Sequence, residues 1–352
     1  MWNLITRNRA ALMALAILGV LLTHTNNNYG CFALNRLIVM GYGGVDVFFF
    51  LSGFGLYFSY SKKPQPLAFY RKRLLRIYPA FLAVLAIYLT QKHLWSWPFF
   101  LEMASTVGFW LPIRFHCTYL AWFVSAILLL YALTPLYWQA FRRWPAASTL
   151  ATFALSGILC ALFVWTFTVL YPGYFHGYML FIARIPVFYL GFFAGYCHAH
   201  DLPHTRPARR WTAAVMALAF VVGFAALQYG LNHYSWKELR LCGMLFYPYL
   251  LITPGFCVGM GWMVSKLPQA IERTLGWLGG FTLEAYLLIS VIYTYKAQFV
   301  RLAGGNSSLG CLLMVLATLT AAWLLHHVVG FGMAWLSQGT KRLARRCRHE
   351  RG

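Results

Sequence analysis

The chain has little charge and almost no acid. Asp and Glu supply only 7 of its 352 residues, against 29 Lys and Arg, and all charged residues together make up 10%. This composition excludes a soluble enzyme, whose surface needs far more charge. Hydrophobic residues, in contrast, reach 61% and aromatic residues 18%. Apolar runs long enough to cross a bilayer, at ~20 residues each, fill nearly the whole chain, so we predict an all-α polytopic membrane protein.

The sequence also lacks the signatures of metal sites and of separate domains. Its 8 cysteines are scattered, without a Cys-x-x-Cys pair, which argues against zinc and against a disulfide framework. The histidines between His198 and His204 lie in a proline-broken loop that fixes no ligand geometry, so we expect no metal. Neither a long-period repeat nor a low-complexity linker interrupts the chain. We therefore expect one membrane domain over residues 1–340 and a basic tail over 341–352.

The apolar runs predict ten crossings, with boundaries good to a few residues. They fall at about 10–26, 44–61, 77–91, 119–138, 148–171, 178–198, 211–231, 242–264, 276–299 and 308–336. The aromatic segment from about 93 to 117 fits this series badly, and we predict that it forms an outer-face interfacial or re-entrant pair of helices. An eleventh crossing is the alternative.

The positions of Lys and Arg set the orientation. With a cytoplasmic N-terminus, 21 of the 29 lie on the cytoplasmic side, 7 lie outside and Arg184 lies within a span. This asymmetry agrees with the positive-inside rule and places both termini in the cytoplasm. The net charge of +22 is thereby explained by orientation, and we expect no nucleic-acid partner. The tail from Lys341 is most simply an anchor to anionic membrane lipid.

Charges at membrane depth are candidate functional residues. Asp46 lies in the run Gly-Val-Asp-Val-Phe-Phe-Phe-Leu-Ser-Gly-Phe that opens the second span, where an unpaired charge costs roughly 2.5–3.5 kcal/mol. Arg184 and Glu284 also fall within spans. Because a charge cannot face lipid cheaply, we expect both to point inward and to pair with each other, with Asp46 or with Arg9.

A dense basic cluster follows the second span. It contains four cations within six residues, namely Arg71, Lys72, Arg73 and Arg76. Guanidinium groups bind phosphate oxygens bidentately, so the cluster suits a polyphosphate ligand at the membrane surface. Any cytoplasmic loop is basic, however, and anionic lipid is the alternative ligand.

Five sequence blocks, in order and with matching spacing, resemble the type 3 integral-membrane acyltransferase family. They cover about residues 4–330 and comprise Gly44–Phe54, Phe69–Pro79, Ala121-Trp-Phe with Tyr131–Pro135, Arg184–Gly191 and Leu278–Leu288. The resemblance implies an enzyme of a bacterial inner membrane that moves an acetyl or short acyl group from cytoplasmic acetyl-CoA to a hydroxyl of a surface or periplasmic carbohydrate. It implies no permanently bound cofactor and leaves the oligomeric state open.

The resemblance assigns roles to single residues. His24 aligns with the family's essential first-span histidine, which implies a general base or acyl relay; imidazole suits this role because its pKa of about 6.5 lets it exchange protons near neutrality. The alternative is a plain interfacial histidine. Asp46 either orients this imidazole or caps its own helix. Glu284 matches a family acid and either lines a central cavity or pairs structurally, while Trp122 and Arg184 fall in blocks that imply acceptor contacts.

On the donor side, Arg73 and Arg76 match the family's paired arginines, which implies that they hold the phosphates of coenzyme A, with Arg71 beside them. The family pattern also has a cation eleven positions before the histidine, where this chain has Met13. Arg9 is the nearest substitute, about 60° from His24 around the helix and ~22 Å away along it.

Two other classes of function remain open. A transporter or flippase would use Asp46, Arg184 and Glu284 as a path for a polar substrate or for protons. An inactive family member acting as a scaffold or sensor is suggested by Met13, and by Ile289 where the family often has a histidine.

Overall fold

The computed structural model describes residues 1–110, 119–170, 181–235, 238–239 and 245–349. Residues 119–121, 163–170 and 336–349 are described by their backbone alone. Throughout these described ranges the chain folds into α-helices and short 3-10 turns, without a β-strand. The expected all-α polytopic architecture is therefore confirmed. The boundaries of the helices are α1 (Trp2–His24), α2 (Phe32–Met40), α3 (Gly44–Lys62), α4 (Pro66–Gln91), α5 (Trp97–Ser105), α6 (Tyr119–Phe141), α7 (Pro145–Leu170), α9 (Arg184–Ala199), α10 (Arg206–His233), α12 (Tyr247–Val264), α13 (Gln269–Leu278), α14 (Thr282–Ile292), α15 (Lys296–Leu302) and α16 (Ser307–His349).

Ten of these helices coincide with the expected crossings. Within the described ranges, 8 helical segments are long and apolar enough to cross a membrane, and they contain α1, α3, α4, α6, α7, α10, α14 and α16. The shorter α9 and α12 coincide with the other two expected crossings; α9 is largely buried against α3, and α12 packs on α10 and α1 with part of its surface exposed.

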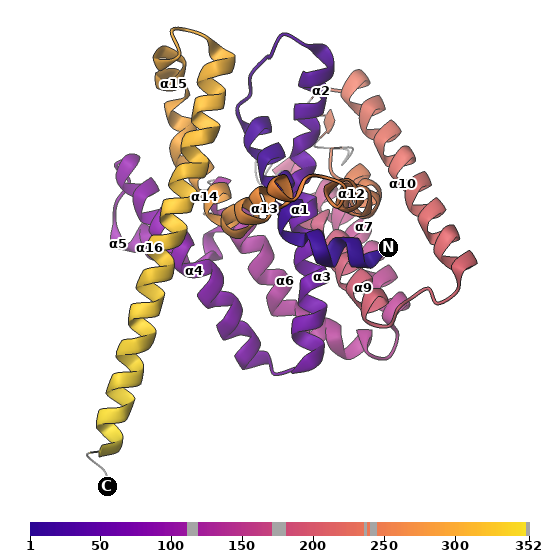
Figure 1. The fold of residues 1–352 in the computed structure, drawn as a ribbon, viewed down its shortest axis with the longest axis horizontal. Helices are drawn as coiled ribbons and strands as arrows, with labels where there is room; N and C mark the ends of the chain where they lie inside the picture. The colour runs from indigo at the N-terminus through magenta and orange to yellow at the C-terminus, as the bar shows by residue number, and fades with distance from the viewer. Residues whose placement is uncertain (111–118, 171–180, 236–237, 240–244, 350–352) are drawn as a thin grey trace.

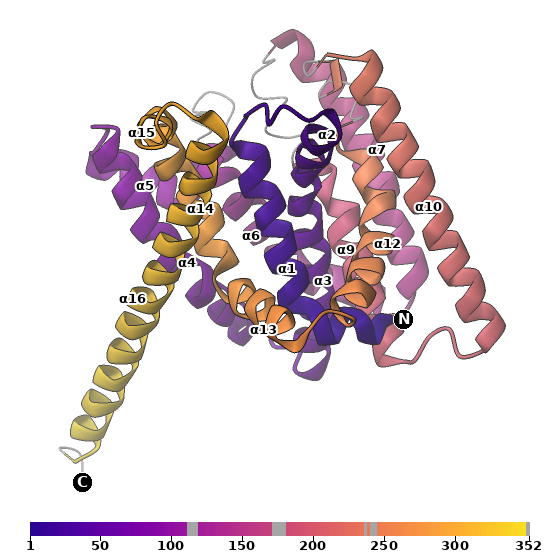
Figure 2. The ribbon, with the colours of Figure 1, turned by 45° about the horizontal axis from the view of Figure 1, so that its top comes forward.

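Helices α1, α3 and α9 form the centre of the bundle (Figures 1 and 2). Two glycines allow α3 and α9 to meet at their backbones. A Cβ atom at Gly53 would lie 1.9 Å from the carbonyl oxygen of Phe188, and one at Gly191 would lie 2.0 Å from that of Phe50. Small residues at such contacts let membrane helices pack closely. This packing fixes α9 against α3 and so sets where the charged residues of both helices lie.

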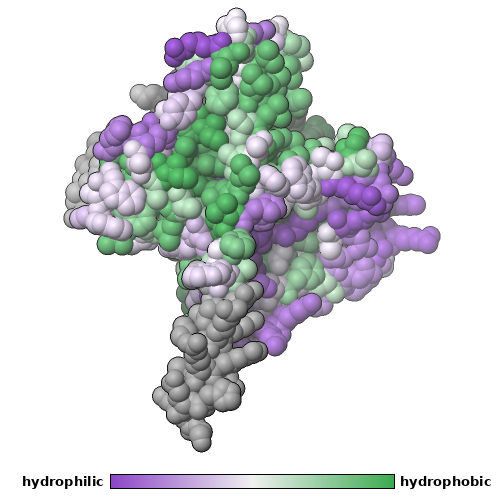
Figure 3. All heavy atoms as spheres, turned by 60° about the vertical axis from the view of Figure 1, so that its left-hand side comes forward, coloured by the Kyte–Doolittle hydropathy of each residue, from purple (hydrophilic) through white to green (hydrophobic). Residues whose placement is uncertain are grey.

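The outer helices present apolar surface. α10 and α16 lie at opposite edges of the bundle (Figures 1 and 2). Large hydrophobic residues on both helices are exposed, among them Val215, Leu218, Val221, Leu316 and Val328. Figure 3 shows hydrophobic residues gathered over much of one face of the molecule, with hydrophilic residues toward its edges. A surface of this kind suits a hydrocarbon environment.

The segment expected at the outer face contains only short helices where it is described. α5 has nine residues, too few to cross a bilayer, and the 3-10 turn η2 (Val107–Phe109) follows it. Trp97 and Leu101 on α5 are exposed. Residues 111–118, the rest of this segment, lie outside the described residues.

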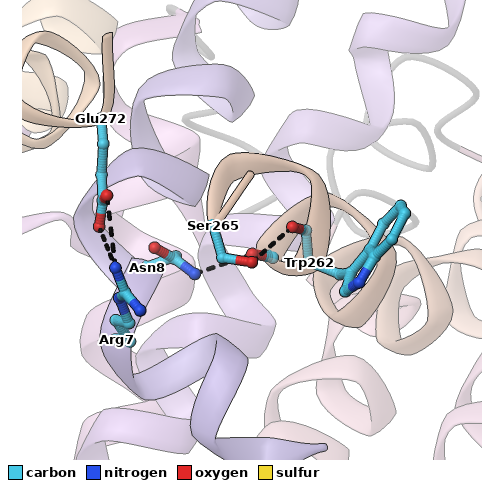
Figure 4. Close-up of polar contacts among 6 residues, drawn as sticks. Arg7, Asn8, Trp262, Ser265 and Glu272 are labelled. Atoms are coloured by element: carbon cyan, nitrogen blue, oxygen red, sulfur yellow. Dashed lines mark hydrogen bonds and ion pairs between the residues drawn. The ribbon is translucent and has the colours of Figure 1, made fainter. Parts of the chain in front are cut away.

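Two helices differ from the expected ranges. α4 begins at Pro66 instead of at residue 77, because proline is favoured in the first turn of a helix and the basic stretch continues the same helix beyond the apolar part. The stretch between the crossings expected at 44–61 and 77–91, which carries the basic cluster, is therefore helical from Pro66 onward. α1 begins at Trp2 and has a kink at Asn8, where φ is −102° and ψ is 15°. The Nδ2 of Asn8 donates to the carbonyl of Gly261 at 2.8 Å (Figure 4).

Candidate active site

Three of the four arginines expected to bind the acyl donor line one cavity. Arg9 comes from α1, and Arg73 and Arg76 come from α4. Arg73 and Arg76 reach it together because residues three apart lie on the same face of a helix. The cavity has an empty volume of about 670 Å³, including the part open to solvent, and its other lining residues are Met13, Phe48, Ser52, Ile77, Phe123, Ile127, Tyr131, Thr282, Leu283 and Tyr286.

The lining changes from basic to apolar along the bundle. Helices α1, α4 and α14 run in one direction and α3 and α6 in the other (Figure 2), so position along each helix gives depth. At the end that carries the N-terminus lie Arg9 and the two α4 arginines, with Tyr131 of α6 and Thr282 of α14. Toward the middle lie the apolar lining residues Met13, Phe48, Phe123, Ile127 and Tyr286. The cavity is therefore suited to a ligand with an anionic head and an uncharged arm.

The kink in α1 separates two arginines that are close in sequence. Arg7 points to Glu272 on α13, with 3.4 Å between Nη2 and Oε1 (Figure 4). Arg9 turns the other way, and its Nε and Nη2 donate to the carbonyl oxygen of Leu51 on α3 at 3.2 and 3.1 Å. This contact orients the guanidinium of Arg9 beside the cavity that it lines.

Aromatic rings orient the next cation. The guanidinium carbon of Arg73 lies 5.5 Å from the ring centre of Phe69 and 5.4 Å from that of Tyr131. Such cation–π contacts are stronger where water is excluded. Arg71 and Lys72 are exposed on other faces of α4 and do not line the arginine cavity. Of the residues expected to bind the donor, the structure thus brings together Arg9, Arg73 and Arg76 and separates Arg71 from them.

Asp46 and Arg184 form a fully buried ion pair. Both side chains are 0% exposed, and Nη2 of Arg184 lies 3.0 Å from Oδ2 of Asp46. The guanidinium also lies over three aromatic rings, 5.9 Å from that of Tyr42, 5.8 Å from that of Trp122 and 5.0 Å from that of Phe246. The pairing of Arg184 with Asp46 was one of the expected alternatives. Within the described part of the chain, Oδ1 of Asp46 and the Nε and Nη1 of Arg184 have no hydrogen-bond partner.

His24 ends α1 on the opposite side of the bundle from Arg9. Its Nδ1 lies 2.8 Å from the carbonyl oxygen of Val20, one turn earlier. The end of α1 is fixed by residues that follow α14. The Nζ of Lys296 donates to the carbonyls of Thr25 at 2.7 Å and Asn26 at 3.0 Å, and the hydroxyl of Tyr293 donates to that of Leu21 at 2.8 Å. A cation at a helix C-terminus satisfies its last carbonyls and complements its dipole.

Glu284 pairs with a histidine. Its Oε1 lies 2.8 Å from Nδ1 of His326 on α16, with side chains 9% and 45% exposed respectively. Its neighbours Thr282, Leu283 and Tyr286 line the arginine cavity, while the carboxylate of Glu284 turns toward α16. Sequence reasoning missed His326 and Lys296. An ionisable residue inside the apolar stretch of α16 was a signal for His326.

The structure is an all-helical membrane bundle in which three arginines line a partly apolar cavity, an arrangement that suits an anionic ligand. Residues 11–327 match the acyltransferase domain family, so the chain belongs to this type 3 acyltransferase family. It is accordingly a multi-pass membrane acyltransferase. No curated protein and no solved structure matches the chain.

Proposed function

We propose that the protein transfers an acetyl or other short acyl group from acyl-CoA to a hydroxyl of a carbohydrate. Arg73, Arg76 and Arg9 bind the phosphates of the donor at the cytoplasmic face of a bacterial inner membrane. His24, toward the periplasmic side, is the general base. The observation that carries the proposal is the cavity itself, basic at one end and apolar toward the middle of the bundle, which fits the phosphates and the pantetheine arm of coenzyme A.

The reaction needs one proton carrier. His24 accepts the proton of the acceptor hydroxyl as its oxygen attacks the thioester carbonyl; the carbon–sulfur bond then breaks, and the coenzyme A thiolate takes the proton back from the imidazolium. The products are the ester and free coenzyme A. Because ~22 Å of helix separates Arg9 from His24, the pantetheine arm extends between the helices to present the acyl group.

We place the acceptor next to Trp122 and Arg184. The Nε and Nη1 of Arg184 lack hydrogen-bond partners among the described residues, which supports binding of sugar hydroxyls there. The indole ring of Trp122 beside the guanidinium supports binding of an apolar sugar face. Asp46 acts through Arg184 by holding its guanidinium. Glu284 has a supporting role through His326. Arg71 binds anionic lipid, and so does the tail from Lys341. The side chains of that tail lie outside the described residues.

The test is transfer from radiolabelled acetyl-CoA by purified protein in the presence of cell-envelope carbohydrate. We expect label to appear in the carbohydrate and His24→Ala to lower the rate at least a hundredfold, since general acid–base catalysis typically contributes 10²–10⁴-fold. His327→Ala is the matched control, because His327 is exposed and its hydrogen bond among the described residues is within its own helix, where Nδ1 lies 2.8 Å from the carbonyl oxygen of Trp323.

Other outcomes of this experiment would indicate a different class of function or a different catalytic residue. Transport of a labelled sugar without hydrolysis of or transfer from acetyl-CoA would identify a transporter. Binding of coenzyme A without turnover would identify an inactive scaffold or sensor. A His24→Ala variant that keeps more than about a tenth of the wild-type rate would remove His24 as the base.

A further inference from the structure

Arg9 lies across a single turn of α3. Its guanidinium donates twice to the carbonyl of Leu51, and its carbon and Nη2 would each be 3.0 Å from a Cβ atom at Gly55. Its Nε would be 3.3 Å from the same atom. Gly55 therefore forms the surface on which the guanidinium rests.

The two α3 contacts belong together. In an α-helix the N–H of residue 55 donates to the carbonyl of residue 51, and the Cβ of residue 55 tilts back over that carbonyl. A carbonyl oxygen has a second lone pair, which a glycine at the following turn leaves open to a side chain from another helix. Arg9 occupies this position.

On the other helix, the kink at Asn8 fixes the direction of the arginine. Asn8 is buried and bonds the carbonyl of Gly261, so the turn of α1 that carries Arg9 cannot rotate freely. Arg9 is further from His24 than Met13 is, yet both line the same cavity.

We propose that Gly55 is a positioning residue for Arg9, which it allows to lie against α3 as the third cation of the acyl-donor cavity. The proposal rests on the proposed function, because the ligand of the cavity is acyl-CoA. It predicts that a side chain at residue 55 displaces the guanidinium without disturbing the bundle, since the atoms in its way are the far end of a flexible side chain.

The experiment measures the affinity of purified, detergent-solubilised protein for coenzyme A by calorimetry, at several salt concentrations. Gly55→Val should weaken binding roughly tenfold, the effect of losing one charge-assisted contact, and should make the affinity less dependent on salt. Gly259→Val is the matched control, because a Cβ at this exposed α12 glycine meets nothing within 4 Å. It should bind like wild type.

A double-mutant cycle separates positioning from packing. In an Arg9→Ala background, Gly55→Val should weaken binding no further, because the group it displaces is gone. Equal weakening in both backgrounds, or wild-type affinity and salt dependence in Gly55→Val, would overturn the positioning role. Failure of the wild-type protein to bind coenzyme A would instead overturn the proposed function, and the donor role of Arg9 with it.

Discussion

Two of the 7 acids in this chain lie at membrane depth with a partner from another helix: Asp46 forms a buried ion pair with Arg184, and Glu284 has a hydrogen bond with His326. That Asp46 needs a partner could be predicted from the cost of a lone charge in a membrane. Which partner it takes could not, because the choice depends on how α3 and α9 pack, and the two residues are far apart in sequence.

The buried pair gives a prediction about stability. Arg184→Met leaves the carboxylate of Asp46 buried alone and should destabilise the protein by about 3–5 kcal/mol, whereas Arg184→Met combined with Asp46→Leu should recover most of that loss. Reversible unfolding in mixed micelles, followed by tryptophan fluorescence, measures both. If the double variant is as unstable as Arg184→Met, the destabilisation comes from lost packing against Trp122 and the neighbouring rings, and the ion-pair account is wrong.

A second prediction at this scale concerns Met13. Arg9→Ala should lower the affinity for acetyl-CoA at least tenfold, and adding Met13→Arg should restore most of it, because residue 13 lines the same cavity one turn away. Calorimetric titration of the wild-type protein, of Arg9→Ala and of the double variant with acetyl-CoA measures the three affinities. Unchanged affinity in Arg9→Ala would mean that α4 alone binds the phosphates; loss without rescue would mean that the position of the cation along α1 matters.

At the scale of the element, the extension of α4 decides which basic residues act together. A loop would leave all four cations of the cluster equivalent. The helix instead places Arg73 and Arg76 in the lining of the cavity and Arg71 outside it. Hydropathy could not predict that α4 begins at Pro66, because the first turns of this helix are charged and contain no apolar run. Pro66 and the spacing of the two arginines were the usable signals.

The same helix supplies its own control. Replacing Arg73 and Arg76 by Glu should raise the Michaelis constant for acetyl-CoA at least tenfold, since charge-assisted contacts to phosphate are worth ~1.5–3 kcal/mol each. Arg71→Glu should leave it within about twofold, because Arg71 does not line the cavity and its charge is screened by solvent. Initial rates at varied acetyl-CoA test this. Equal effects of both changes would show a general surface potential instead of a binding site.

For the whole molecule, apolar run length was enough to predict an all-helical bundle and the approximate place of its long apolar helices. Helix ends and tertiary contacts were harder to predict from the sequence. The kink at Asn8 follows from its bond to Gly261 on α12, a contact that no local pattern encodes. Likewise, the end of α1 beside His24 is fixed by Lys296, far along the chain. A site assembled from five helices needs the packing as well as the pattern.

The last prediction tests the orientation of the bundle. The ten predicted crossings would return the C-terminus to the side of the N-terminus, and 21 of 29 cations would then face the cytoplasm. Reporter fusions at residues 66, 143, 205 and 345 should therefore all report cytoplasm. A periplasmic signal at 143 alone would show that the segment from 93 to 117 crosses fully and that a later crossing is misassigned. Signals from all four in the periplasm would place the arginine cavity on the side without acyl-CoA, and the proposed donor site would fail.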